Sequence, residues 1–296
     1  MSVVNAIVQG ILLGGLYALF ACGLSLMFGV MRIINLAHGD IAVLGAFGVW
    51  VVTTQLGISP LVALLIALPV MLALGYGLQV TLLARSLKAG ELTPLLTTFG
   101  LAIVIQNALL QIFSPDVRSL GAATGRLSIG SWRIADRLAV PYLGILVLVL
   151  AVAVLGGLQL MLARTRFGRE MRATAQDPDT AGLVGVPAPA VYAQATAIAV
   201  GTATLAGVFL GIHASFAPSS GPTQLIFAFE AVVIGGLGSL WGTLVGGIVL
   251  GIAQTLGALI DPQYSILAGH IVFLVVLASP RGQLLWRRRA AGSVAA

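Results

Sequence analysis

The chain has 296 residues, of which 59% are hydrophobic and only 8% are charged, and its formal net charge at pH 7 is +6. A soluble domain carries about 25% charged residues, so this composition excludes a soluble fold and predicts a chain that lies in a lipid bilayer. The apolar runs are long and uninterrupted, which excludes a barrel of short alternating strands and predicts an all-α, polytopic helical bundle.

The apolar runs predict eight or nine membrane segments in a single domain over residues 1–296. In chain order they are 4–30, 38–55, 59–84, 92–113, 140–163, 190–216, 225–238, 241–260 and 264–280. The first run is too long for a signal-peptide core, so we expect it to be retained as a helix. The 225–238 run is shorter than the roughly 20 residues that cross the hydrocarbon, which is typical of a broken or re-entrant half-helix.

The basic residues lie at the ends of the apolar runs, which indicates topology signals rather than a surface for nucleic acid. Placing the 164–190 loop and the Arg287–Arg289 tail in the cytoplasm puts most of the 15 basic residues on that side. The residues left outside are Arg118, Arg126, Arg133 and Arg137. This bias predicts a multi-pass membrane protein with its N-terminus outside and its C-terminus in the cytoplasm.

Two longer polar stretches connect the apolar runs. Residues 114–139 mix Gly, Ser and Arg with Trp132, and we expect an ordered external loop with a short hairpin. Residues 164–190 form the predicted cytoplasmic loop, which carries the densest group of charges in the chain. A charged, partly helical loop on one side of a bilayer is suited to contact with another protein.

The 165–187 sequence predicts two short helices joined by a tight turn. Residues 167–176 have helix-forming composition, with Phe167, Met171 and Ala175 four residues apart on one face. Asp177 is the expected N-cap of the second helix, followed by Pro178 at its first position. Such a pair fits a groove on a cytoplasmic partner. The alternative is an ordinary loop that only sets the topology.

The sequence contains no nucleotide-binding motif. A P-loop needs the pattern G-x-x-x-x-G-K-[ST], because its lysine reaches the phosphates. The only lysine is Lys88, in SLKAGEL, and the Gly-rich run GGLGSLWG (235–242) has none. The single cysteine, Cys22, and the separated His213 and His270 give no metal site. We therefore expect no cofactor and no catalytic residues in this chain, and any ATP hydrolysis in a partner.

Polar residues interrupt several of the apolar runs. Glu230 lies in IFAFEAVVIGGLG, and a carboxylate within the membrane is a candidate functional residue. Asn35 is a second candidate for the lining of a polar path, whereas hydrogen bonding between packed helices is the alternative for both. For Gln106 and Asn107 we favour the packing alternative. We expect Arg32, His38 and Asp40 at the inner membrane interface.

Three stretches together resemble the permease subunit of branched-chain amino acid ABC transporters, the shorter of the two permeases in that system. The chain is similar to this family nearly end to end. The stretches are QGILLGGLYALFACGLSLMFGVMRIINLAHGD (9–40), TRFGREMRATAQDPDTAGLVGV (165–186) and FEAVVIGGLGSLWGTLVGGIVLG (229–251).

The resemblance implies a location in the bacterial inner membrane. It also implies a second homologous permease, two cytoplasmic ATPase subunits and a periplasmic substrate-binding protein as partners. It also implies that the 165–187 stretch meets the ATPase, with a core of Gly168, Glu170, Arg172, Ala173, Asp177 and Gly185. The 229–251 stretch resembles the family's glycine-rich broken helix beside the translocation path. The path candidates are Asn35, Glu230, Gly235, Gly236 and Gly238.

Two alternatives stay open at this point. Permeases for urea and short-chain amides look similar, and the polar residues do not separate an amino acid from a neutral amide. A self-sufficient transporter driven by an ion gradient is the alternative from another class, with Glu230 as the ion site. The 165–187 stretch distinguishes the two classes, because a self-sufficient transporter needs no docking surface.

Overall fold

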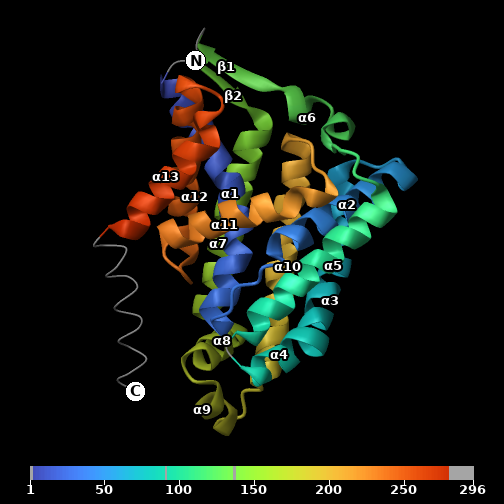
Figure 1. Ribbon diagram of the computed structural model, residues 1–296, viewed down its shortest axis with the longest axis vertical. Helices are drawn as coiled ribbons and strands as arrows, with labels where there is room; N and C mark the ends of the chain where they lie inside the picture. The colour runs from blue at the N-terminus through green and yellow to red at the C-terminus, as the bar shows by residue number, and fades with distance from the viewer. Residues whose placement is uncertain (1–2, 91, 136–137, 280–296) are drawn as a thin grey trace.

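The computed structural model describes residues 3–90, 92–135 and 138–279, and it forms a bundle of helices (Figure 1). Seven of the described helices are long and apolar enough to cross a membrane. They are α1 (Val3–Met31), α2 (His38–Leu56), α3 (Pro60–Leu78) with its continuation to Ala89, α5 (Thr93–Phe113), α7 (Tyr142–Arg164), α10 (Ala188–His213) and α12 (Leu240–Ile260). The predicted all-α membrane bundle is confirmed.

The remaining predicted segments are two shorter helices. The 225–238 run belongs to α11 (Gly221–Gly235), which has 15 residues, and the last run forms α13 (Tyr264–Ala278). The 59–84 run does not end at residue 84. It continues through a π-helical turn, η1 (Gln79–Leu83), into α4 (Ala84–Ala89).

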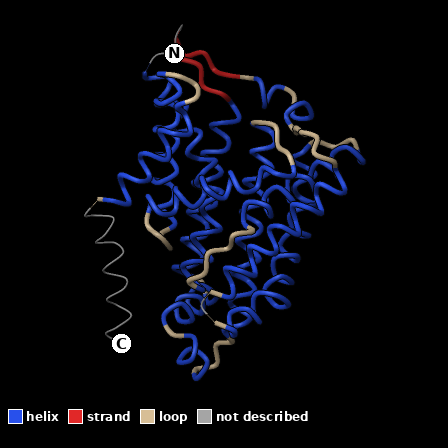
Figure 2. Tube along the Cα trace, in the orientation of Figure 1, coloured by secondary structure: helices blue, strands red, loops and turns tan. Residues whose placement is uncertain are grey.

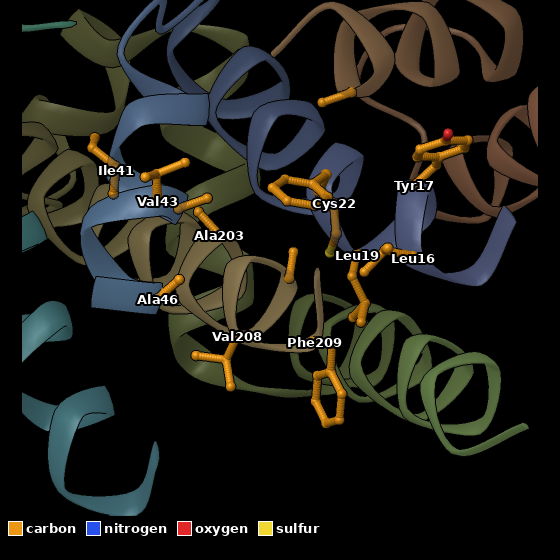
Figure 3. Close-up of a cluster of buried hydrophobic side chains, with 14 of the residues drawn as sticks. Leu16, Tyr17, Leu19, Cys22, Ile41, Val43, Ala46, Ala203, Val208 and Phe209 are labelled. Carbon is orange, nitrogen blue, oxygen red and sulfur yellow. The ribbon is translucent and has the colours of Figure 1, made fainter. Parts of the chain in front are cut away.

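Helices α1 and α10 form the centre of the bundle, because about four-fifths of the most apolar stretch of each is buried. Figure 3 shows their side chains meeting those of α2, among them Leu19, Cys22, Ile41, Ala203 and Phe209. Glycines of α1 allow this helix to pack closely against α12. A side chain at Gly10 or Gly14 would meet the backbone of Ile252 or Ile248.

The chain reverses direction twice inside the bundle. After α1, residues 32–37 return along it, and α2 starts at His38, whose Nε2 lies 2.9 Å from the carbonyl oxygen of Phe20 near the middle of α1. After α10, residues 214–220 return in the same way, and α11 starts at Gly221, against the backbone of Gly39. Both helices therefore begin within the depth of the bundle rather than at its ends.

These reversals relate two halves of the molecule, α1–α2–α3–α5 and α10–α11–α12–α13. Helix α1 packs along α12 as α10 packs along α3, and α11 packs on α1 as α2 packs on α10. Likewise α2 contacts α5 as α11 contacts α13. Because the two halves start from opposite ends of the bundle, this is the arrangement of an inverted repeat with broken helices at its centre.

The two polar stretches lie at opposite ends of the bundle, as the topology predicts (Figure 2). One end carries α8 (Arg166–Gln176) and α9 (Pro178–Leu183). The other carries η2 (Gly121–Thr124), α6 (Arg126–Ile129) and a hairpin of β1 (Ser131–Ala135) and β2 (Leu138–Pro141), which confirms the predicted hairpin. Below, these are called the α8–α9 end and the hairpin end.

Candidate coupling segment and buried polar sites

Helix α8 forms at a capped start and is anchored through one face. The Thr165 hydroxyl accepts a hydrogen bond from the Gly168 N–H at 3.0 Å, which satisfies one of the free amides at the helix start. Met171 is buried among side chains of α1 and α10, and Phe167 packs against the same cluster. The predicted apolar face therefore attaches α8 to the membrane-spanning bundle.

Gly168 is required where α7 turns into α8. A side chain there would collide with the backbone carbonyls of Met161 and Leu162. The last turn of α7 and the first turn of α8 can pack this closely only because glycine has a hydrogen atom where other residues have Cβ. Gly168 thus couples the direction of α8 to that of the spanning helix α7.

Helix α9 begins as predicted, with Asp177 as its N-cap and Pro178 as its first residue. The Asp177 carboxylate accepts hydrogen bonds from the N–H groups of Asp179 and Thr180 at 3.0 and 3.1 Å, and from the Thr180 hydroxyl at 2.6 Å. The Thr180 hydroxyl, followed by these amides, holds the pKa of Asp177 below its usual range. Gly185, at a φ of +84°, ends the turn after α9 in a conformation that favours glycine.

Glu170 is already paired within α8, because its Oε1 accepts a hydrogen bond from the Arg166 Nε at 2.9 Å. Ala173 is half-buried one turn further along, while Arg172 is exposed. The sequence did not single out the apolar tip of this segment. Leu183 is 88% exposed and Val184 76% exposed where α9 ends. These two residues form a small exposed apolar tip on an otherwise polar loop.

A cavity of about 530 Å³ joins this segment to the glycine-rich turn before α12. It lies between α1, α7, α8 and that turn, and its lining includes Ser25, Gln159, Arg172 and Gly238. The structure thus brings together Arg172 and Gly238, which the sequence placed in two separate predicted sites. A movement of α8 would change the shape of this cavity directly.

The glycines of the α11–α12 turn permit its sharp reversal. Gly236 and Gly238 have φ values of +91° and +79°, and a side chain at Gly235 would meet the backbone of Gly242. Gly238 also lies against Gly29 of α1. These residues are placed for close backbone packing, and their role in a path stays a prediction.

The polar residues before and in α2 are buried, so the expectation that His38 and Asp40 lie at the inner interface is wrong. His38 is fully buried, Asp40 is 2% exposed, and the return of residues 32–37 carries both towards the middle of α1. Asn35 is also buried and stabilises this return, since its Oδ1 accepts the Ala37 N–H at 3.0 Å. Only Arg32 is exposed, near the α8–α9 end.

Glu230 is buried between α11 and α13, where it forms an ion pair or hydrogen bond with His270. No spacing in the sequence indicates this contact, because the two residues are 40 positions apart. Beside it, the Tyr17 hydroxyl donates to Gln254 Oε1 at 2.5 Å, and the Tyr17 ring lies 5.2 Å from that of Phe227. The geometry gives Glu230 a partner within the chain, while its predicted role in a path stays open.

Asn107 does not make the hydrogen bond to a neighbouring helix that the favoured packing role predicts. Its amide N–H donates to the Ile103 carbonyl of the same helix at 2.8 Å, and the side chain is exposed. Within the described part of the chain it therefore makes no bond to another helix that the structure records. Gln106, its neighbour, is half-buried.

The sequence pattern of one protein family, described as "Branched-chain amino acid transport system / permease component", matches residues 6–278. The chain belongs to this family. It is 31% identical to the high-affinity branched-chain amino acid transport system permease protein BraD of Pseudomonas aeruginosa, over 94% of each chain. It is 30% identical to the corresponding permease protein LivH of Escherichia coli K12, over 93% of each. The fructose import permease protein FrcC of Rhizobium meliloti is 29% identical, over 83% of this chain and 69% of that protein.

Proposed function

We propose that this chain is the membrane-spanning permease subunit of an ATP-driven importer for branched-chain amino acids. The observation that carries the proposal is membership of the permease family over nearly the whole chain. The α8–α9 end would face the cytoplasm, and ATP would be hydrolysed by two partner subunits. A second homologous permease would complete the path, and a periplasmic protein would deliver the substrate.

The geometry of the α8–α9 end supports docking of an ATPase there. The two helices are held rigidly, through the caps at Thr165 and Asp177 and the buried Met171. Their tip presents Leu183 and Val184 to the outside. A displacement of α8 by a docked ATPase would be passed on to α7, because Gly168 keeps α8 in backbone contact with that helix. In the cavity, the same displacement would reach Gly238.

The substrate assignment is supported by the relatives, several of which are named as branched-chain amino acid permeases. FrcC, at a similar level of identity, transports a sugar, so similarity alone leaves room for another solute. Competition experiments with the assembled transporter decide this point. Leucine, isoleucine and valine should compete for uptake, whereas urea, acetamide and fructose should not.

The partner assignment is tested by mild-detergent purification of the chain from its native membrane, comparing wild type with Leu183→Glu/Val184→Glu. We expect wild type to retain a second permease and two ATPase subunits. The double variant should insert normally, keep the second permease and lose the ATPases, since a charged tip cannot enter an apolar groove. Ile129→Glu is the matched control, because Ile129 is 85% exposed at the hairpin end. A wild-type chain that purifies alone and moves substrate under an ion gradient would overturn the proposal.

A further inference from the structure

Helix α5 is a spanning helix that carries two exposed amide side chains, Asn107 and Gln111. One outward line of this helix is formed by residues spaced four, three and four positions apart, so that they lie one above another: Gly100, Val104, Asn107 and Gln111. All four are exposed, and nothing in the described chain lies within 4 Å of the place where a side chain on Gly100 would begin. Figure 1 shows α5 on the outside of the bundle.

Asn107 is within the span rather than at its edge, since it lies six residues before the end of the 21-residue helix α5. Its bond to the Ile103 carbonyl uses one amide N–H and leaves the rest of the side-chain amide without a partner that the structure records. Facing lipid, that amide would lose its hydrogen bonds to water and receive nothing in exchange. Helix α5 also exposes apolar side chains such as Leu96 and Ile112. Helix α3 (Pro60–Leu78) exposes apolar side chains such as Leu65 and Val70 but contains no amide side chain.

A second element next to α5 exposes polar groups at a similar place. The turn η3 (Pro218–Ser220) contacts α5, and it leads into α11. Ser219 of this turn and Thr223 of the first turn of α11 are exposed. Because α11 starts against Gly39, close to the middle of α1, these hydroxyls lie within the depth of the bundle rather than at its end.

We propose that these two elements form the wall that this chain contributes to a water-filled translocation path, opposite the second permease subunit. The wall consists of the outward line of α5 together with Ser219 and Thr223. Its uncharged amide and hydroxyl groups suit a small polar solute in transit, because they exchange hydrogen bonds with it without holding it through a full charge. The inference rests on the proposed function and adds the surface that faces the path.

Single cysteines test the wall in membrane vesicles that contain the assembled transporter. The native Cys22 is fully buried, so the parent chain gives the background. Asn107→Cys and Thr223→Cys are compared with Val70→Cys, a control at the middle of α3 that is 64% exposed. The probe is a charged, membrane-impermeant methanethiosulfonate reagent, and the fraction modified is followed over time.

We expect Asn107→Cys and Thr223→Cys to react at least about tenfold faster than Val70→Cys, because only a thiol in contact with water ionises to the reactive thiolate. Their modification should also block uptake. Equally slow reaction of all three, with rapid reaction of Ser119→Cys in the external loop, would overturn the inference. Such a result in an intact complex leaves the proposed function standing. Isolation of the chain without a second permease would instead contradict the proposed function.

Discussion

Helices α2 and α11 start at the same depth in the two inverted halves, yet their surroundings differ. The start of α2 is enclosed: His38 is bonded to the Phe20 carbonyl, and Asn35 braces the chain before it. The start of α11 is open on one side, with Ser219 and Thr223 exposed. The same backbone plan thus gives an anchored reversal in one half and an accessible one in the other.

The contacts of α2 and α11 with the outer helices α5 and α13 also differ between the two halves. Helix α2 meets α5 through aromatic stacking, with the rings of Phe47 and Phe113 4.6 Å apart. Helix α11 meets α13 through the Glu230–His270 pair, beside the more distant Phe229–Phe273 rings. A polar contact depends on geometry and protonation more than a stacked apolar one does.

The largest expected effect on stability comes from forcing apart the starts of α2 and α11, which are in contact at Gly39 and Gly221. A side chain at Gly39 would collide with the Gly221 carbonyl, whereas Gly48 of the same helix has open space around it. Gly39→Leu should lower the free energy of unfolding by about 3 kcal/mol and abolish uptake, since the backbones cannot part without breaking the core. Gly48→Leu, the control, should stay within about 0.5 kcal/mol of wild type. Denaturant unfolding in detergent measures both, and equal stability of the two variants would contradict the close contact.

A double-mutant cycle sharpens the comparison between the outer helices. His270→Leu alone strands a buried carboxylate, whereas His270→Leu with Glu230→Leu removes both polar groups. We expect the double variant to be more stable than His270→Leu, with a coupling energy of about 1–2 kcal/mol because the His270 side chain is partly exposed. The Phe47–Phe113 pair, changed to Leu in the same way, should show a coupling of about 1 kcal/mol. Additive effects of the Glu230 and His270 changes would show that the two side chains do not interact.

The smallest expected effect is on the local stability of α9, which lies outside both inverted halves. This helix starts at the cap formed by Asp177. The pKa of Asp177 is lower folded than unfolded, so its stabilising contribution is present above the unfolded value of about 3.9 and is lost as the pH falls through the folded value. The protection from hydrogen exchange that the cap gives to peptides covering residues 177–184 should therefore stay constant between about pH 5 and 8. Asp177→Ala should speed exchange throughout this range, and Asp177→Asn, which retains a capping oxygen, should not. Identical exchange in the Ala and Asn variants would show that the cap does not order α9.

The sequence by itself determined the helical membrane fold and most segment positions, because an apolar run of about 20 residues has few alternatives in a bilayer. It also predicted the cap at Asp177 and the two helices around it, since capping is local chemistry. Only the tertiary structure decided what depends on packing between distant segments. The burial of His38 and Asp40, the pairing of Glu230 with His270 and the outward position of Asn107 all follow from how the two inverted halves pack. Spacing along the chain does not predict this packing, because it brings together residues that are far apart in the sequence.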